Sequence, residues 1–112
     1  MDNLIRLQRD RKSVGHFFFT RGELGQLLSL YSSRVAAGEW RDYALDQLDD
    51  MVLFSIFRHT HERPLYSVAK TLPRGQRRPS YTLFNGPKRL KTTQNLRDLL
   101  LTFDKLPRLV TG

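Results

Sequence analysis

The sequence of 112 residues contains no cysteine, and it also lacks any long uninterrupted apolar run. The absence of cysteine excludes disulfides and thiolate metal sites. No stretch approaches the roughly 20 apolar residues that a helix needs to cross a bilayer. The first 13 residues also lack the apolar segment of a secretory signal. We therefore expect a soluble, cytoplasmic protein with no membrane partner, and the residue pattern indicates neither a cofactor nor a metal.

Acidic residues are scarce in the second half of the chain, although the formal net charge of the whole is +8. Between Phe57 and Arg97, Glu62 is the single acid among ten cations. These cations are Arg58, Arg63, Lys70, Arg74, Arg77, Arg78, Lys88, Arg89, Lys91 and Arg97. The segment from Glu23 to Asp50 is acidic by contrast. Such a charge distribution is evidence about partners rather than about the fold, and it favours a polyanion.

The segment from Met51 to Lys70 is the clearest structural signal. Met51–Arg58 is apolar at alternate positions on both faces, which is typical of an interior strand that is at least partly covered on both sides. His59–Arg63 supplies a polar turn, and Leu65–Thr71 alternates as a half-exposed partner strand does. This pattern predicts an antiparallel hairpin.

Two helices are expected on either side of this hairpin. Thr20 and Glu23 have the spacing of a capping box, and Gly38 is expected to end the helix that follows. Thr92 or Thr93 is expected to cap the second helix, which Pro107 ends. The expected apolar stripes are Leu24, Leu27, Leu28, Tyr31 and Val35 for the first helix and Leu96, Leu99, Leu100 and Phe103 for the second.

Three further segments are candidates for strands. Val14–Phe19 and Tyr81–Phe84 are rich in residues that favour strands, and Asn85-Gly86 is a turn signal. Tyr43–Leu48 is expected either as a strand beside the central one or as irregular backbone. The proline- and arginine-containing segment from Leu72 to Ser80 is expected to be a loop.

These elements predict an α+β fold, with an antiparallel sheet of four to five strands and two helices packed on one face. The length fits one domain. We assign residues 13–106 to this domain, residues 1–12 to a flexible basic arm and residues 107–112 to a tail. The protein is expected to be a monomer or a homodimer.

Three sequence blocks resemble a known family. Trp40–Asp46 (WRDYALD), Phe54–Arg58 (FSIFR) and Glu62–Tyr66 (ERPLY) occur in this order. They are similar to blocks in a family of small alphaproteobacterial proteins that is known only as a domain of unknown function. The resemblance covers roughly residues 19 to 100. It implies a bacterial cytoplasmic protein, and it brings no activity with it.

The first functional hypothesis is nucleic-acid binding without catalysis, with RNA favoured over DNA. A basic loop and a basic segment before the second helix would meet phosphates, and the aromatic side chains of Tyr66, Tyr81 and Phe84 would stack on unpaired bases. The candidate residues are Arg74, Arg77, Arg78, Lys88, Arg89, Lys91, Arg58, Arg63 and Lys70. The hypothesis requires that these side chains converge into one patch. The alternative is a basic surface that is merely solvated.

The second hypothesis is a regulatory adaptor that binds another protein. Trp40 would be the aromatic anchor of the interface, with Arg41, Asp42 and Tyr43 beside it. The alternative is that Trp40 packs beneath the sheet.

The third hypothesis is a small ribonuclease. His59, His61 and Glu62 lie together in the sequence near Arg58 and Arg63, and they could supply an acid, a base and phosphate contacts. Two histidines without a third ligand are a weak metal signal, and histidines in turns are commonly just solvated.

Overall fold

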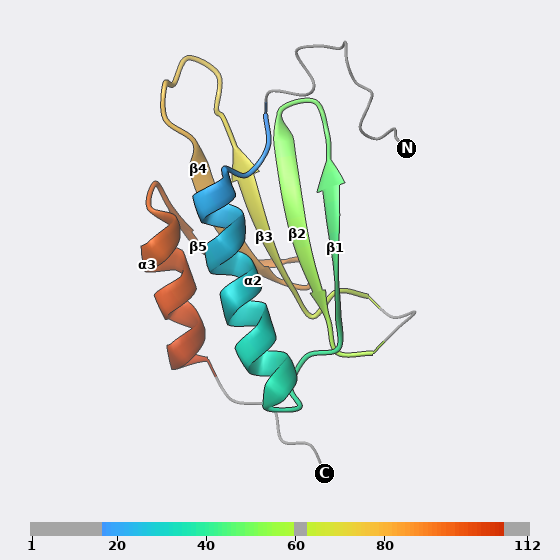
Figure 1. Cartoon of the computed structure of the whole chain (residues 1–112). Coiled ribbons are helices and arrows are strands. Elements are labelled where there is room, and N and C mark those ends of the chain that lie inside the picture. The colour runs from blue at the N-terminus through green and yellow to red at the C-terminus, as the bar shows by residue number, and fades with distance from the viewer. Residues whose placement is uncertain (1–16, 60–62, 107–112) are drawn as a thin grey trace.

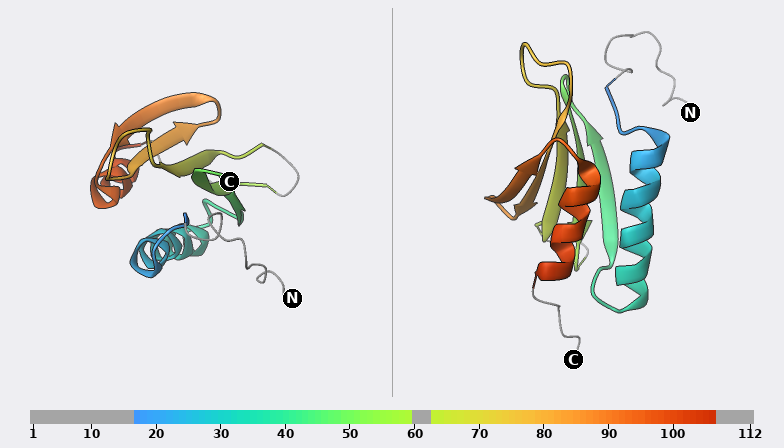
Figure 2. Two further views of the ribbon diagram at one scale, coloured as in Figure 1. Left: turned by 90° about the horizontal axis from the view of Figure 1, so that it is seen from above. Right: turned by 90° about the vertical axis from the view of Figure 1, so that its left-hand side faces the viewer.

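The computed structural model describes residues 17–59 and 63–106, which form a five-stranded antiparallel sheet with two helices on one face (Figure 1, Figure 2). The strands are β1 (Asp42–Gln47), β2 (Met51–Phe57), β3 (Tyr66–Thr71), β4 (Ser80–Asn85) and β5 (Lys88–Thr93). The helices are α2 (Arg21–Ala36) and α3 (Leu96–Leu101), and the 3-10 helix η1 (Thr102–Lys105) follows α3. This architecture confirms the predicted α+β class.

The sheet is a simple meander in which each strand pairs with the one before it. The order is β1-β2-β3-β4-β5, so β1 and β5 are the two edges. Phe54 in β2 lies opposite Leu45 in β1 and Val68 in β3, which confirms both the predicted hairpin and the strand over Tyr43–Leu48. None of the helices in the described part of the chain is long and apolar enough to cross a membrane.

Helix α2 begins as its sequence predicts. The Glu23 amide donates to Thr20 Oγ1 at 3.1 Å, and the Thr20 amide donates to Glu23 Oε1 at 2.8 Å, which completes the capping box. The helix ends at Ala36, and Gly38 follows with a positive φ of 79°. Leu27 is buried on the sheet side, whereas Val35, at the end of the predicted stripe, is 39% exposed.

The second helix starts later than predicted. Asn95 is its N-cap, and its side-chain oxygen accepts from the amides of Arg97 and Asp98. Thr92 and Thr93 instead lie in β5, so the prediction that one of them caps the helix is wrong. Leu96 and Leu99 are buried as expected, while Phe103 completes the stripe from η1. Pro107 lies outside the described residues.

The strand predicted over Val14–Phe19 is not supported by its described part, because residues 17–19 are not in a strand. Hydrogen bonds from side chains hold this segment in place, whereas a strand would be held by backbone hydrogen bonds to its neighbour. Gln47 Nε2 donates to the Phe17 carbonyl at 2.7 Å, and Lys70 Nζ donates to the Phe18 carbonyl at 2.8 Å. Phe19 is buried in the core. The predicted basic arm, residues 14–16 and the predicted tail lie outside the described residues.

The two faces of the sheet differ because α2 and α3 cover only one of them (Figure 2). Val52, Phe54 and Ile56 point to the helices and are fully buried. Alternate residues of β2 point to the other face, which we call the open face: Met51, Leu53 and Phe57 are half-buried there, whereas the small Ser55 is buried among its neighbours. Strand β2 is therefore an interior strand that helices cover on one side only.

Candidate nucleic-acid interface

The open face carries a row of side chains that combines hydroxyls, an aromatic ring and a cation. Strand pairing places Ser55 opposite Ser67, Ser67 opposite Phe84 and Phe84 opposite Arg89. Directly opposed side chains on one face of an antiparallel sheet have Cβ atoms about 4.5–5.5 Å apart. Phe84 is half-buried and Arg89 is exposed, and the register of β4 and β5 shifts between Leu83 and Phe84, so this pair lies at an irregularity beside the sheet edge. Tyr66 and Tyr81, the other aromatic residues predicted to stack on bases, are buried in the core, which corrects that part of the prediction.

The cations nearest to this row lie at one end of the sheet, which we call the turn end. The turn end comprises the connection between β2 and β3 and the Asn85-Gly86 turn between β4 and β5. Two backbone hydrogen bonds tie these segments together: Leu65 N donates to the Ile56 carbonyl at 2.8 Å, and Gly86 N donates to the Leu65 carbonyl at 3.2 Å. The structure thus brings Arg63 from one connection to the end of the sheet that also carries Lys88 and Arg89.

The arginine loop, residues 72–79, lies at the opposite end of β4 (Figure 1). Arg74, Arg77 and Arg78 are exposed there, and Gly75 adopts a positive φ of 81° in the turn. Five steps along β4, at about 3.3 Å each, separate the two ends by roughly 16 Å. The predicted single patch is therefore two clusters. Asp49 and Asp50, in the turn between β1 and β2, lie at the same end of the sheet as the arginine loop.

The segment before the second helix also differs from its prediction. Lys88, Arg89 and Lys91 are exposed residues of the edge strand β5, not residues of a helix start. The free amides and the positive dipole end of a helix N-terminus therefore do not assist these residues in binding phosphate. Among the described residues, Arg34 forms ion pairs with Glu39 and with Asp104, and Lys70 forms one with Glu23. None of these three ion pairs involves a cation of the open face.

Lys70 does not belong to the interface, which corrects its assignment as a phosphate contact. Its ammonium group is buried on the helix side, 2.8 Å from Glu23 Oε1, and lies 5.6 Å from the Phe17 ring centroid. The Tyr81 hydroxyl donates to the other oxygen of Glu23. Burial alone raises the pKa of Glu23, but hydrogen bonds from Lys70, Tyr81 and the Thr20 amide outweigh it and keep the pKa below its ordinary value of 4.5. Burial and the Glu23 carboxylate raise the pKa of Tyr81.

Trp40 is a core residue, which corrects its assignment as the anchor of a protein interface. It is 3% exposed and meets the Phe103 ring edge-on at a centroid distance of 5.4 Å. Arg34 lies over its indole at 5.4 Å and binds the buried Glu39 at 3.0 Å. Of its proposed neighbours in the interface, Arg41 and Asp42 are exposed, and Tyr43 stacks on Phe54 at a centroid distance of 5.2 Å.

The residues proposed for catalysis are only partly described. Arg58 is half-buried after β2, His59 is exposed, and both interact with other parts of the protein. His61 and Glu62 lie outside the described residues. Within residues 17–59 and 63–106, no group of three or more histidine and acidic side chains is placed to hold a metal ion.

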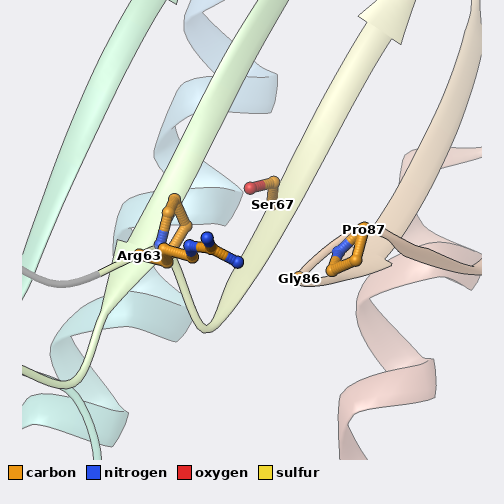
Figure 3. A pocket seen from close by; sticks show the side chains of 5 residues that line it. Arg63, Ser67, Gly86 and Pro87 are labelled. Carbon is orange, nitrogen blue, oxygen red and sulfur yellow. The ribbon is translucent and has the colours of Figure 1, made fainter.

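The turn end also contains a small hollow that the sequence did not predict. Arg63, Pro64, Ser67, Gly86 and Pro87 line it, and its volume is about 230 Å³ (Figure 3). The Asn85-Gly86-Pro87 signal predicted a turn here. It did not predict that the turn faces the connection between β2 and β3, because that depends on the pairing of β3 with β4.

The family comparison matches residues 17–100 to a model described as a protein of unknown function, DUF2794. The chain belongs to the DUF2794 family. The matched region of this DUF2794 protein spans the whole sheet, α2 and most of α3, so the open face and the hollow both lie within it. No curated protein and no solved structure matches the sequence. The family description assigns no activity.

Proposed function

We propose that this DUF2794 protein binds single-stranded nucleic acid, RNA in preference to DNA, on the open face of its sheet. The observation that carries the proposal is the pairing of Phe84 with Arg89 on a solvent-facing surface. Bases stack on exposed aromatic rings regardless of sequence, and guanidinium groups bind the neighbouring phosphates.

The cations do not form the single patch that the sequence-based hypothesis required, so the proposal is restricted to a strand long enough to reach two separate clusters. Arg63 and Arg89 lie at the turn end of the open face, Lys88 lies at the same end opposite Asn85 on the helix side, and Arg74, Arg77 and Arg78 form the second cluster beyond the far end of β4. A strand that crosses the face from one end to the other meets the arginine loop at one end, and cations together with the Phe84 ring at the other. Regular duplex RNA keeps its bases stacked inside, so its bases are not available to Phe84. This is why we favour single strands.

The proposal is tested by fluorescence anisotropy with a labelled single-stranded RNA decamer over a series of salt concentrations. For single strands, the logarithm of the affinity falls with the logarithm of the salt concentration by about 0.7 for each neutralised phosphate. We expect a steep slope, and Lys88→Gln combined with Arg89→Gln reduces it. The double variant Arg97→Gln and Lys105→Gln removes the same charge from exposed positions of α3 and η1, and it is the control. No binding at low salt contradicts the proposal.

A protein partner is the second candidate, because Met51, Leu53 and Phe57 form a half-exposed apolar strip on the open face. Apolar side chains of this kind are found at the centres of protein interfaces. A pull-down from lysate treated with nuclease separates the two candidates. A partner that is retained after nuclease treatment and lost in Leu53→Lys favours the protein interface, whereas loss of all captured material after nuclease favours nucleic acid.

A further inference from the structure

The hollow at the turn end is built from two connections that the fold holds together. Arg63 and Pro64 come from the connection between β2 and β3, and Gly86 and Pro87 come from the turn between β4 and β5. Figure 3 shows Arg63 on one side, Gly86 and Pro87 on the other, and Ser67 of β3 between them. The hydrogen bond from Gly86 N to the Leu65 carbonyl fixes the spacing of the two walls. The hollow is therefore formed before any ligand binds.

Its lining combines apolar walls with a few polar groups. The rings of Pro64 and Pro87 offer flat apolar surfaces, and proline nitrogen carries no hydrogen that would need a partner. The Ser67 hydroxyl can donate or accept one hydrogen bond, and the Arg63 guanidinium offers several donors in one plane. This set fits a flat heteroaromatic ring that carries an anionic group.

The size of the hollow restricts the ligand further. Its volume of about 230 Å³ is below the roughly 300–1,000 Å³ of pockets for drug-sized ligands. The hollow therefore has room for one ring system. Ser67 also lies opposite Phe84, so a base in the hollow is followed on the open face by the aromatic ring that would receive the next base.

We propose that the hollow binds one unpaired base of a single-stranded nucleic acid, with Arg63 on the phosphate of that nucleotide. This inference rests on the proposed function, and it adds a site that recognises the base itself. The proline rings contact the faces of the base, and the Ser67 hydroxyl bonds to its edge. Bases in a regular duplex are not accessible to such a site.

The test compares two labelled decamers of equal charge, decaadenylate and a decamer with abasic nucleotides throughout. We expect the wild-type protein to bind decaadenylate about tenfold more tightly, because base stacking contributes to affinity. Ser67→Phe fills the hollow. It should therefore lower the ratio of the affinity for decaadenylate to the affinity for the abasic decamer, leaving only the part that stacking on Phe84 contributes. Ser29→Phe is the matched control, since it adds the same ring at an exposed position of α2, away from the open face, and should leave the ratio unchanged.

Arg63→Gln is the second variant, because Arg63 is exposed and its replacement requires no repacking. It should weaken the binding of decaadenylate and reduce the salt slope by about 0.7. If Ser67→Phe folds and leaves the ratio unchanged, the hollow is not a base site, although the proposed function stands. If decaadenylate and the abasic decamer bind wild type equally, no base is recognised, which excludes both the hollow and stacking on Phe84. If neither decamer binds at low salt, the proposed function fails and this inference fails with it.

Discussion

At the scale of single residues, Glu23 serves two structures at once. Its side chain completes the capping box of α2 with Thr20 and also accepts hydrogen bonds from Lys70 and Tyr81 of the sheet. The sequence predicted the first role from the spacing of Thr20 and Glu23. It could not predict the second, because Lys70 and Tyr81 are more than 40 residues away in the chain.

Glu23→Gln should lower the free energy of unfolding at pH 7 by about 2 kcal/mol, because hydrogen bonds to a charged group are lost. The pKa of Glu23 is lowered in the folded state, so its contribution to stability is complete above its ordinary value of 4.5 and disappears as the pH falls through the lowered value. Urea unfolding at pH 7 and at pH 3 measures this. The wild type should lose more stability on acidification than the variant, whereas the exposed Asp46→Asn should behave as wild type. Parallel losses in wild type and Glu23→Gln would contradict the role of Glu23.

Arg34 is the second residue whose charge is buried. Its side chain is 7% exposed and binds Glu39 at 3.0 Å and the Phe103 carbonyl at 3.3 Å. Arg34→Met leaves the Glu39 carboxylate buried without this partner, which should cost about 3–5 kcal/mol of unfolding free energy. Arg34→Met combined with Glu39→Leu should recover most of the loss, as measured by urea unfolding. A double variant no more stable than Arg34→Met alone would show that the pair is not what stabilises this region.

At the scale of elements, the sequence predicts strands well where one face is buried and poorly where both are exposed. The alternation of Leu65–Thr71 predicted β3, and Asn85-Gly86 predicted the next turn. Lys88–Thr93 was not recognised as a strand because Leu90 is its only apolar residue. An edge strand that carries charges needs no apolar alternation, and such charges protect the edge from pairing with other chains.

Two glycines in different elements should respond oppositely to the same substitution. Gly25→Ala in α2 should raise the free energy of unfolding by about 1 kcal/mol, because alanine favours the helix. Gly86→Ala should lower it by about 1–2 kcal/mol, because Gly86 has a φ of 59° that residues with a side chain disfavour. An added Cβ meets no heavy atom within 4 Å at either position. Steric contacts therefore do not contribute to the difference in unfolding free energy between the two variants. Thermal unfolding of both variants checks the signs, and equal signs would show that backbone conformation is not the cause.

At the scale of the whole molecule, the fold separates what the sequence placed together. Ten cations follow one another between Phe57 and Arg97 with little acid among them, which predicted one basic surface. The meander places the arginine loop and the turn end at opposite ends of β4, and the helix side buries Lys70. Sequence proximity predicts a charge cluster only where the intervening segment does not cross the sheet.

The candidate site depends on the same topology. Residues Arg63, Ser67, Phe84 and Arg89 come from three segments of the chain, and only the register of β3, β4 and β5 brings them to one end of one face. The sequence identified three of these residues as candidates by type. It missed Ser67, which is an ordinary strand residue until its position beside the turn is known.

The most direct test of the account is a map of amide chemical shifts in the ¹⁵N-labelled protein as decaadenylate RNA is added at low salt. We expect the largest changes at Ser67, at the Asn85-Gly86 turn and at Arg89, with little change along the outer surface of α2. Changes confined to the helices, or a spectrum that does not respond to the RNA, would contradict it.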